Sequence, residues 1–164
     1  MSVTEETKRQ NRELCEKYPF LIPSNRWTGK RITDGAGYWA KEPDVIPEYD
    51  YEFTELDSMP SGWRKAFGTQ LCDELKAELE SANYINEYRI TDIKEKYGTL
   101  RIYDNCNTAK GHEIISRYEN LSSRICIKCG KPATRVTTGW ISPYCDGCCP
   151  DEMYSTDIND FYKG

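Results

Sequence analysis

Apolar residues recur at every fourth position in the middle of the chain. They are Trp63, Phe67, Leu71, Leu75 and Leu79. Side chains spaced by three or four residues lie on one face of an α-helix. Pro60 and Ser61 stand where a helix commonly begins. The pattern predicts a core helix that begins at Ser61, buries this stripe and leaves its charged face in water.

Two other segments have weaker helical patterns. Thr4 to Lys17 is mostly polar, with Thr4 as a candidate N-cap, and Pro19 ends it. Thr108 to Arg124 carries a second apolar stripe, made by Ile114, Ile115, Tyr118 and Leu121. This stripe predicts a helix that packs by one face against the rest of the core.

Apolar and polar residues alternate in the segment that follows the central helix. Residues 88–97 and Thr99–Tyr103 flank Gly98, and together they predict a β-hairpin with its turn at residues 96–98. Its exposed basic side chains would form a small basic face, made by Arg89, Lys94, Lys96 and Arg101. Acids lie among the same positions, at Asp92, Glu95 and Asp104, which weakens the case for a nucleic-acid contact.

The stretch from Glu42 to Asp57 contains acids and no Lys or Arg. The acids are Glu42, Asp44, Glu48, Asp50, Glu52, Glu55 and Asp57. Between Tyr49 and Phe53 aromatic residues alternate with acids, which predicts a strand with one acidic face in water. Two interpretations stay open. The stretch is a solvated edge, or it is an acidic patch that binds a basic, nucleic-acid-binding surface of another protein.

Cysteines stand in two pairs near the C-terminus. Cys126 and Cys129 are followed by Cys145 and Cys148, with two residues inside each pair and fifteen between the pairs. This spacing is typical of a structural zinc site with four thiolate ligands. Cys149 is an alternative fourth ligand, although Cys148 keeps the two-residue spacing. Gly130 permits the tight turn, and residues 134–142 are rich enough in Val, Thr and Ile to predict a short strand pair.

Two disulfides, or free structural thiols, are the alternatives to a metal. Residues 1–18 are polar and charged, which favours a cytosolic protein with reduced thiols. No role is assigned to the isolated cysteines or to the single histidine, which are Cys15, Cys72, Cys106 and His112.

The composition, 38% apolar and 30% charged over 164 residues, is typical of a globular protein. The expected fold class is α+β, with helices packed on a small antiparallel hairpin and a C-terminal four-cysteine zinc-ribbon or knuckle module. Residues 1–125 form the core, 126–149 the zinc module and 150–164 an acidic tail, either docked or frayed. No Gly/Ser-rich spacer separates the module from the core, so we expect the two to pack together.

The net charge is −5, and both ends of the chain are acidic. Such a chain lacks the basic footprint of ordinary nucleic-acid-binding proteins, so no direct nucleic-acid partner is expected, and no membrane partner either. One histidine, no nucleophile–base pair and a saturated metal site argue against an enzyme. The basic residues around the knuckle (Arg124, Lys128, Lys131, Arg135) keep a zinc-ribbon nucleic-acid-binding or transcription-associated protein as the alternative.

Two strings carry a resemblance. They are Tyr51-Glu-Phe-Thr-Glu-Leu-Asp-Ser-Met-Pro-Ser-Gly-Trp-Arg-Lys-Ala-Phe-Gly68 and Ile93-Lys-Glu-Lys-Tyr-Gly-Thr-Leu-Arg-Ile-Tyr-Asp104, followed by the cysteine pairs and Gly139-Trp140. From about Tyr49 to Cys148 the chain resembles small zinc-bearing proteins of phages and prophages, some of which are type II-A anti-CRISPRs. The resemblance implies a stoichiometric inhibitor that acts in the cytoplasm of the bacterial host, binds Cas9 and blocks the loading or recognition of target DNA. The only site residues that it carries over are the four cysteines of the pairs.

Overall fold

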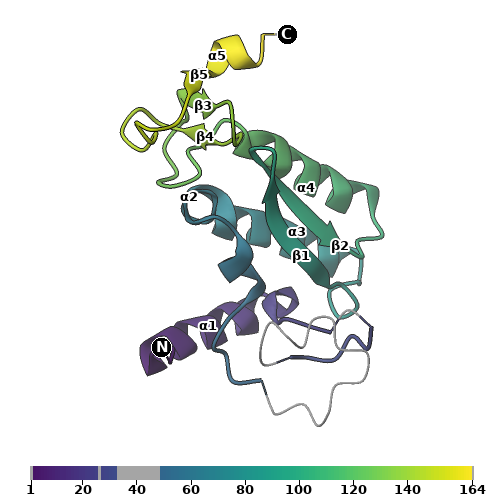
Figure 1. Cartoon of the computed structure of the whole chain (residues 1–164). Coiled ribbons are helices and arrows are strands. Elements are labelled where there is room, and N and C mark those ends of the chain that lie inside the picture. Colours follow the sequence, from purple (N-terminus) through teal and green to yellow (C-terminus); the bar gives the residue numbers. More distant parts are fainter. Residues whose placement is uncertain (1, 26, 33–48, 164) are drawn as a thin grey trace.

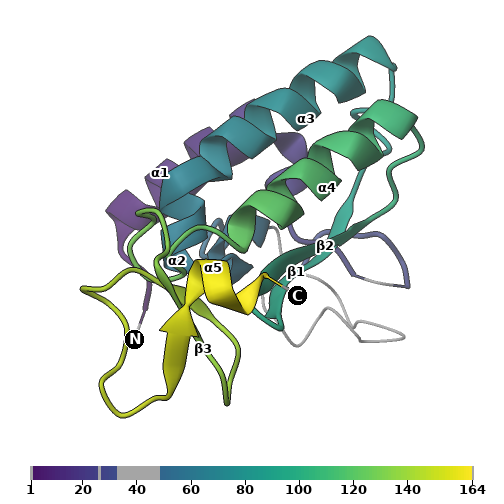
Figure 2. The ribbon, with the colours of Figure 1, turned by 90° about the horizontal axis from the view of Figure 1, so that it is seen from above.

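The computed structural model describes residues 2–25, 27–32 and 49–163, and it has the expected α+β fold. Helix α3 (Thr69–Ser81) and helix α4 (Ala109–Ser122) lie side by side, and α4 packs on strand β2 of a two-stranded hairpin. Figure 1 shows the N-terminal helix α1 (Glu5–Lys17) at one end and a second small sheet at the other. Figure 2 shows α3 and α4 together above the hairpin.

The central helix is confirmed, with one feature that the pattern did not predict. It runs without a break through α2 (Ser61–Trp63), the π-helical segment η4 (Arg64–Gly68) and α3. All five residues of the apolar stripe are buried. In a regular α-helix, residues four apart are rotated by about 40° around the axis, so the stripe would drift away from the core. The wider π turn takes up part of that drift.

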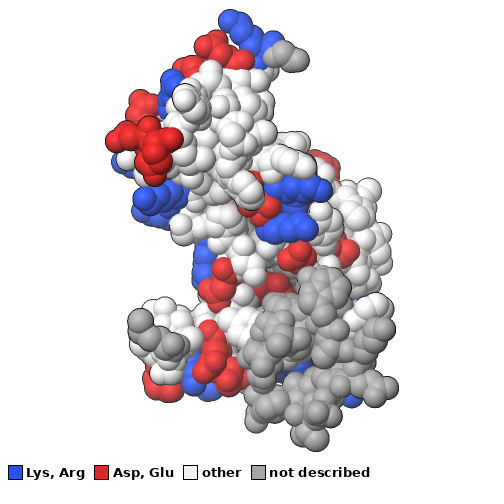
Figure 3. All heavy atoms as spheres, in the orientation of Figure 1, with Lys and Arg blue, Asp and Glu red and all other residues white. Residues whose placement is uncertain are grey.

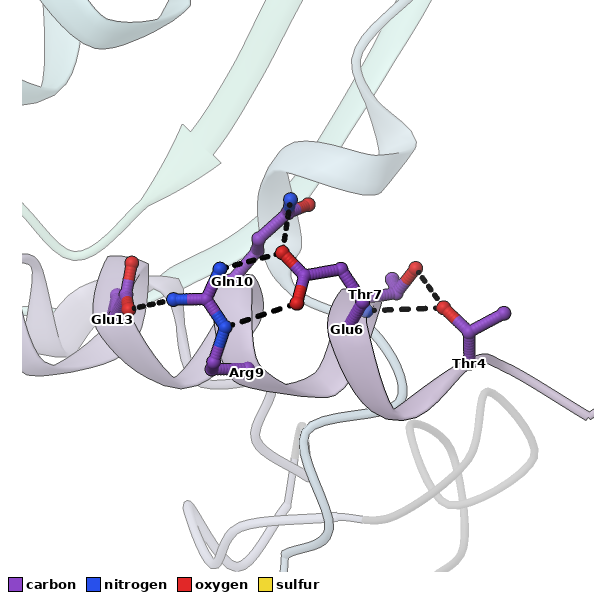
Figure 4. A network of polar contacts seen from close by, with 6 residues as sticks. All are labelled: Thr4, Glu6, Thr7, Arg9, Gln10 and Glu13. Carbon is purple, nitrogen blue, oxygen red and sulfur yellow. Dashed lines mark hydrogen bonds and ion pairs between the residues drawn. The ribbon is translucent and has the colours of Figure 1, made fainter.

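Helix α1 is held by contacts along its own surface (Figure 4). The side chain of Thr4 accepts a hydrogen bond from the Thr7 amide, which confirms it as the N-cap. Arg9 bonds the carboxylates of Glu6 and Glu13, and this guanidinium lowers the pKa of Glu6. The short 3-10 segment η1 (Pro19–Leu21) follows, so the helix ends before Pro19, as predicted.

Strands β1 (Ile90–Lys96) and β2 (Thr99–Asp104) form the predicted antiparallel hairpin. Tyr97 and Gly98 make the two-residue turn, with φ of 53° and 79°. Two consecutive residues with positive φ are the signature of a type I′ turn, whose twist matches that of the strands.

Helix α4 begins at the Thr108 cap, whose hydroxyl accepts from the Gly111 amide. Its buried face holds Ile114, Ile115 and Tyr118, as expected. Leu121 was assigned to the same stripe, and that assignment is wrong because its side chain is 41% exposed. The next position, Ser122, is buried instead, and its hydroxyl accepts from the Leu100 amide of β2.

The second sheet is antiparallel with the order β4-β3-β5. Strand β3 (Arg135–Thr137) lies in the segment predicted to pair, while β4 (Pro143–Tyr144) begins one residue beyond it. Strand β5 (Ser155–Asp157) and helix α5 (Ile158–Phe161) come from the C-terminal segment. Ile158 is buried with Ala133 and Val136. The C-terminal segment is therefore docked from Ser155 to Phe161. The division of the chain into a core, a cysteine module and a tail stays a prediction.

The predicted strand at Tyr49 to Phe53 is wrong. Tyr51 has a φ of 63°, which interrupts an extended backbone. The three aromatic rings pack on one another instead of pointing to one side, since the Tyr49 ring centroid lies 4.7 Å from that of Tyr51 and 6.3 Å from that of Phe53. The 3-10 segment η3 (Glu55–Ser58) follows and leads into the central helix.

Candidate metal centre

The four paired cysteines come together at one point. The Sγ atoms of Cys126, Cys129, Cys145 and Cys148 all lie within 4.8 Å of one another. The Cys129 and Cys145 sulfurs are 3.6 Å apart. A tetrahedral metal ion with bonds of about 2.3 Å to sulfur separates its ligand atoms by about 3.8 Å, so the cluster has the dimensions of a four-thiolate metal site.

The first knuckle, residues 126–131, is a tight turn closed by backbone hydrogen bonds. The Gly130 amide donates to the Cys126 carbonyl over 3.0 Å, and the Cys126 amide donates to the Lys131 carbonyl over 2.7 Å. Gly130 has a φ of 83°, a conformation that L side chains rarely adopt. The predicted role of this glycine is therefore confirmed.

The second knuckle, residues 145–149, contains two neighbouring cysteines, of which one belongs to the cluster. The amides of Cys148 and Cys149 both donate to the Cys145 carbonyl, over 3.2 and 3.1 Å. The Cys148 sulfur lies in the cluster, and that of Cys149 does not. The two-residue spacing therefore identified the right cysteine.

Backbone dipoles prepare the cluster for a cation. Burial of the Cys126 sulfur raises its pKa, but the N–H groups of Cys145, Cys129 and Lys128 outweigh burial and lower the pKa to about 7. The hydrogen bond with Cys145 raises the pKa of Cys148 to about 12. Because a metal binds thiolates, loading the site displaces these protons, and its affinity for metal falls as the pH falls.

The first knuckle packs directly on the start of the central helix. The Gly62 amide donates to the Ile127 carbonyl over 2.9 Å, and the indole Nε1 of Trp63 donates to the Ile125 carbonyl over 3.0 Å. The first amides of a helix have no partner within it, so the knuckle carbonyl satisfies one of these donors. These two hydrogen bonds join the first knuckle to the start of the central helix.

Gly62 leaves room for the knuckle. A Cβ at this position would lie 2.2 Å from the Cys126 carbonyl oxygen and 2.5 Å from the Ile127 carbonyl carbon. Both are backbone atoms, so the knuckle would have to move. We expect Gly62→Ala to destabilise the protein by about 1–3 kcal/mol, although alanine favours a helix. Thermal unfolding followed by circular dichroism measures this change.

Gly147 provides the matched control for this substitution. It lies in the second knuckle, and a Cβ there would meet no atom within 4 Å. Gly147→Ala should leave the melting temperature within about 2 °C of the unaltered protein, since surface changes of this kind have small effects. Equal melting temperatures for the two variants would show that the close approach at Gly62 is not needed.

The acidic stretch does not form one exposed patch in the part of the chain that the structure describes. Glu42, Asp44 and Glu48 lie outside the described residues. Glu55 is only 1% exposed, so its assignment to an exposed partner surface is wrong. Asp57 accepts hydrogen bonds from the Thr54 amide and from Arg64. Figure 3 shows acidic and basic groups scattered in small clusters over the described part of this face.

Asp57 is itself exposed, with 41% of its side chain surface in water, and two further acids of the stretch lie at the surface. Asp50 is exposed and accepts from the Glu52 amide over 3.2 Å. The side chain of Glu52 is 41% exposed and lies 3.8 Å from the Lys8 ammonium. A partner surface built on this stretch therefore rests on Asp50, Glu52 and Asp57 among the described residues.

Basic residues around the knuckle divide into two kinds. Arg135 donates to the Ser155 carbonyl over 2.9 Å, and the Arg124 guanidinium lies 4.6 Å from the centre of the Tyr162 ring. Both therefore hold the C-terminal segment in place. Lys128 and Lys131 are exposed.

The remaining cysteines and the histidine lie outside the cluster. Cys15 and Cys72 are buried, and burial raises the pKa of Cys15 to about 11 and that of Cys72 to about 12. Thiols with such values stay protonated and unreactive at neutral pH. His112 is exposed near the start of α4.

Comparison of the chain with protein-family models, with curated proteins and with solved structures found no match. Among the described residues, every helix falls short of the length and apolar character needed to cross a membrane.

Proposed function

We propose that this chain is a phage-encoded binding protein without catalytic activity, that zinc holds its fold together, and that it inhibits Cas9 by blocking the loading or recognition of target DNA. The observation that carries the proposal is the four-cysteine cluster packed against the start of the central helix. The choice of Cas9 is supported by the resemblance of the sequence motifs to anti-CRISPR proteins.

Zinc is the metal that this donor set fits. Four thiolates with these separations fill every position of a tetrahedral zinc ion, which supports a structural role and leaves no position for a substrate. Structural zinc contributes about 10–16 kcal/mol to the folding of small zinc peptides. Zinc bound here would fix the two knuckles to each other and, through the Gly62 contact, to the core.

Exposed acids supply the chemistry by which such a protein would bind its target. Cas9 holds its guide RNA and target DNA in positively charged channels. Asp50 and Glu52 present negative charge that would steer the protein toward such a channel. The test is co-elution of the zinc-loaded protein with Cas9 bound to guide RNA, together with the binding of target DNA by the same complex. Failure to co-elute would refute the choice of Cas9.

Reversing the charge of Asp50 and Glu52 should weaken the complex. We expect Asp50→Lys with Glu52→Lys to lower the affinity for Cas9 about tenfold or more, because a basic partner surface would then face like charges. Asp151→Lys with Glu152→Lys makes the same change in net charge at the other end of the protein, where both residues are exposed. Calorimetric titration of both double variants separates a local contact from a general charge effect, and equal affinities would rule out this surface.

A further inference from the structure

On the outer face of the β1–β2 hairpin, which is the face opposite its buried residues, two positive charges stand opposite each other. In the register of the two strands, Lys94 stands directly opposite Arg101, with Lys96 opposite Thr99 and Asp92 opposite Tyr103. Like charges directly opposite each other destabilise an antiparallel pair. An anion bound between Lys94 and Arg101 would remove that penalty.

The neighbouring acids do not cancel this charge. Glu95 and Asp104 point away from the outer face, because the Glu95 carboxylate accepts from the Gly98 amide over 2.6 Å and the Asp104 carboxylate accepts from the Tyr88 hydroxyl over 2.6 Å. Asp92 is the one acid that the strand register places on the outer face, 3.8 Å from the Lys94 ammonium. Three cations therefore face one carboxylate, and Figure 3 shows basic side chains gathered over the hairpin.

Large aromatic side chains stand exposed beside these cations. Tyr97 in the hairpin turn is 72% exposed, Trp140 in the β3–β4 loop is 70% exposed, and Tyr103 on the outer face is 45% exposed. The Lys94 ammonium lies 5.1 Å from the centre of the Tyr103 ring. A cluster of exposed aromatic rings, unlike a single exposed ring, commonly marks a binding surface.

A cleft of about 370 Å³ joins the hairpin turn to the loop of the cysteine module. Its walls are Glu95, Lys96, Tyr97, Gly139, Trp140 and Ile141. Gly98 lies against Ile141 so closely that a Cβ would stand 3.0 Å from the Ile141 Cγ2 atom. Lys96 belongs both to this cleft and to the outer face of the hairpin, so the aromatic and basic parts form one surface. Glu95 is the one acid among the cleft walls, and its carboxylate accepts from the Gly98 amide.

We propose that this surface, made by Lys94, Lys96, Arg101, Tyr97, Tyr103 and Trp140, binds single-stranded nucleic acid. The cations would contact phosphates, and the aromatic rings would stack on unpaired bases, which is the combination used by proteins that bind single strands. A duplex keeps its bases stacked inside, so it would use the cations alone. An acidic peptide would likewise satisfy the cations without a flat ring to stack on Tyr97 or Trp140.

This inference goes beyond the proposed function and does not rest on it. It also revises the expectation, drawn from the net charge of the whole chain, that no nucleic acid binds directly. The charge of −5 is a sum over the whole chain, whereas the outer face has a local surplus of cations. A chain that failed to bind Cas9 could still bind an oligonucleotide through the hairpin.

Fluorescence anisotropy with a labelled oligothymidylate and a labelled oligouridylate of about twelve nucleotides tests the proposal, since known sites span about 4–16 nucleotides. The single strands should bind more tightly than a duplex of the same length. Three phosphate contacts predict a slope of log K against log salt concentration of about −2, and Lys94→Gln with Arg101→Gln should reduce it to about −0.7.

Single aromatic substitutions test the stacking. Trp140→Ala and Tyr97→Ala should each weaken oligonucleotide binding by about 5- to 150-fold, because one stacked base contributes in that range. Trp27→Ala removes a tryptophan that is 62% exposed and does not line the cleft, so it should leave the affinity unchanged. Both tryptophans are exposed, so the melting temperatures of these variants should match that of the unaltered protein.

Three results would overturn the proposal. They are no binding of either oligonucleotide at low salt, equal affinities for the single strand and the duplex, or equal affinities of the Trp140→Ala and Trp27→Ala variants. If a polyglutamate peptide bound instead and lost affinity in the Lys94→Gln and Arg101→Gln variant, the surface would be assigned to an acidic protein partner.

Discussion

Replacing Cys126 with serine should remove the bound zinc and lower the melting temperature by at least about 10 °C, given a shift of about 2–4 °C for each kcal/mol in a protein of this size. A serine hydroxyl is not deprotonated at neutral pH, so it cannot replace a thiolate ligand. Cys126 is fully buried, and its knuckle carries the hydrogen bonds to the central helix. Loss of the metal should therefore loosen the knuckle and the start of that helix together.

Zinc content measured by mass spectrometry and thermal unfolding followed by circular dichroism check this result on the same samples. Cys149→Ser is the matched control, since its sulfur lies next in sequence to a ligand but outside the cluster. That variant should keep one zinc ion and its stability. Removing zinc from the unaltered protein with a chelator should reproduce the Cys126→Ser melting curve. A Cys126→Ser protein with unchanged zinc content would refute the assignment of the site.

Replacing Trp63 with alanine should destabilise the protein by about 3–5 kcal/mol, the usual cost of removing a buried tryptophan. The side chain is fully buried at the point where the central helix meets the knuckle. Its Nε1 donates to the Ile125 carbonyl, so the alanine variant loses both a large apolar contact and the partner of a backbone acceptor. The expected fall in melting temperature is about 6–20 °C.

Two further variants separate these contributions. Trp63→Phe keeps an aromatic ring and removes the hydrogen bond, and it should cost about 1–3 kcal/mol through the unsatisfied Ile125 carbonyl. Leu121→Ala removes a side chain that is 41% exposed, so its cost should be well below that of Trp63→Ala. Denaturant unfolding measures all three changes. Equal losses for Trp63→Ala and Leu121→Ala would contradict the position of Trp63 as the link between core and knuckle.

Local patterns were enough to predict the main helices and the hairpin. The four-residue stripe of the central helix, the Thr4 cap and the Tyr97-Gly98 turn depend on neighbours within a few positions, and all three are confirmed. The same holds for the ligands of the metal site, because each cysteine pair is a local turn. The spacing favoured Cys148 over Cys149, and the Cys148 sulfur is the one that lies in the cluster.

Patterns failed where packing overrode them. Alternation at Tyr49 to Phe53 predicted a strand, but contacts among the three aromatic rings and the positive φ of Tyr51 produce an irregular loop. The apolar stripe of α4 was also extended to Leu121, although the residue buried there is Ser122. The reason is a contact with strand β2, because the Leu100 amide donates a hydrogen bond to the Ser122 hydroxyl.

The sequence by itself determined the four-cysteine cluster, the three main helices and the hairpin, because short-range spacing and capping are sufficient to specify them. Only the tertiary structure decided which charged groups are available at the surface. It buried Glu55, turned Glu95 and Asp104 away from the outer face of the hairpin, and paired β5 with β3. It also brought Tyr97 and Trp140 to one cleft. These outcomes depend on contacts between segments far apart in the chain, and a local pattern contains no information about them.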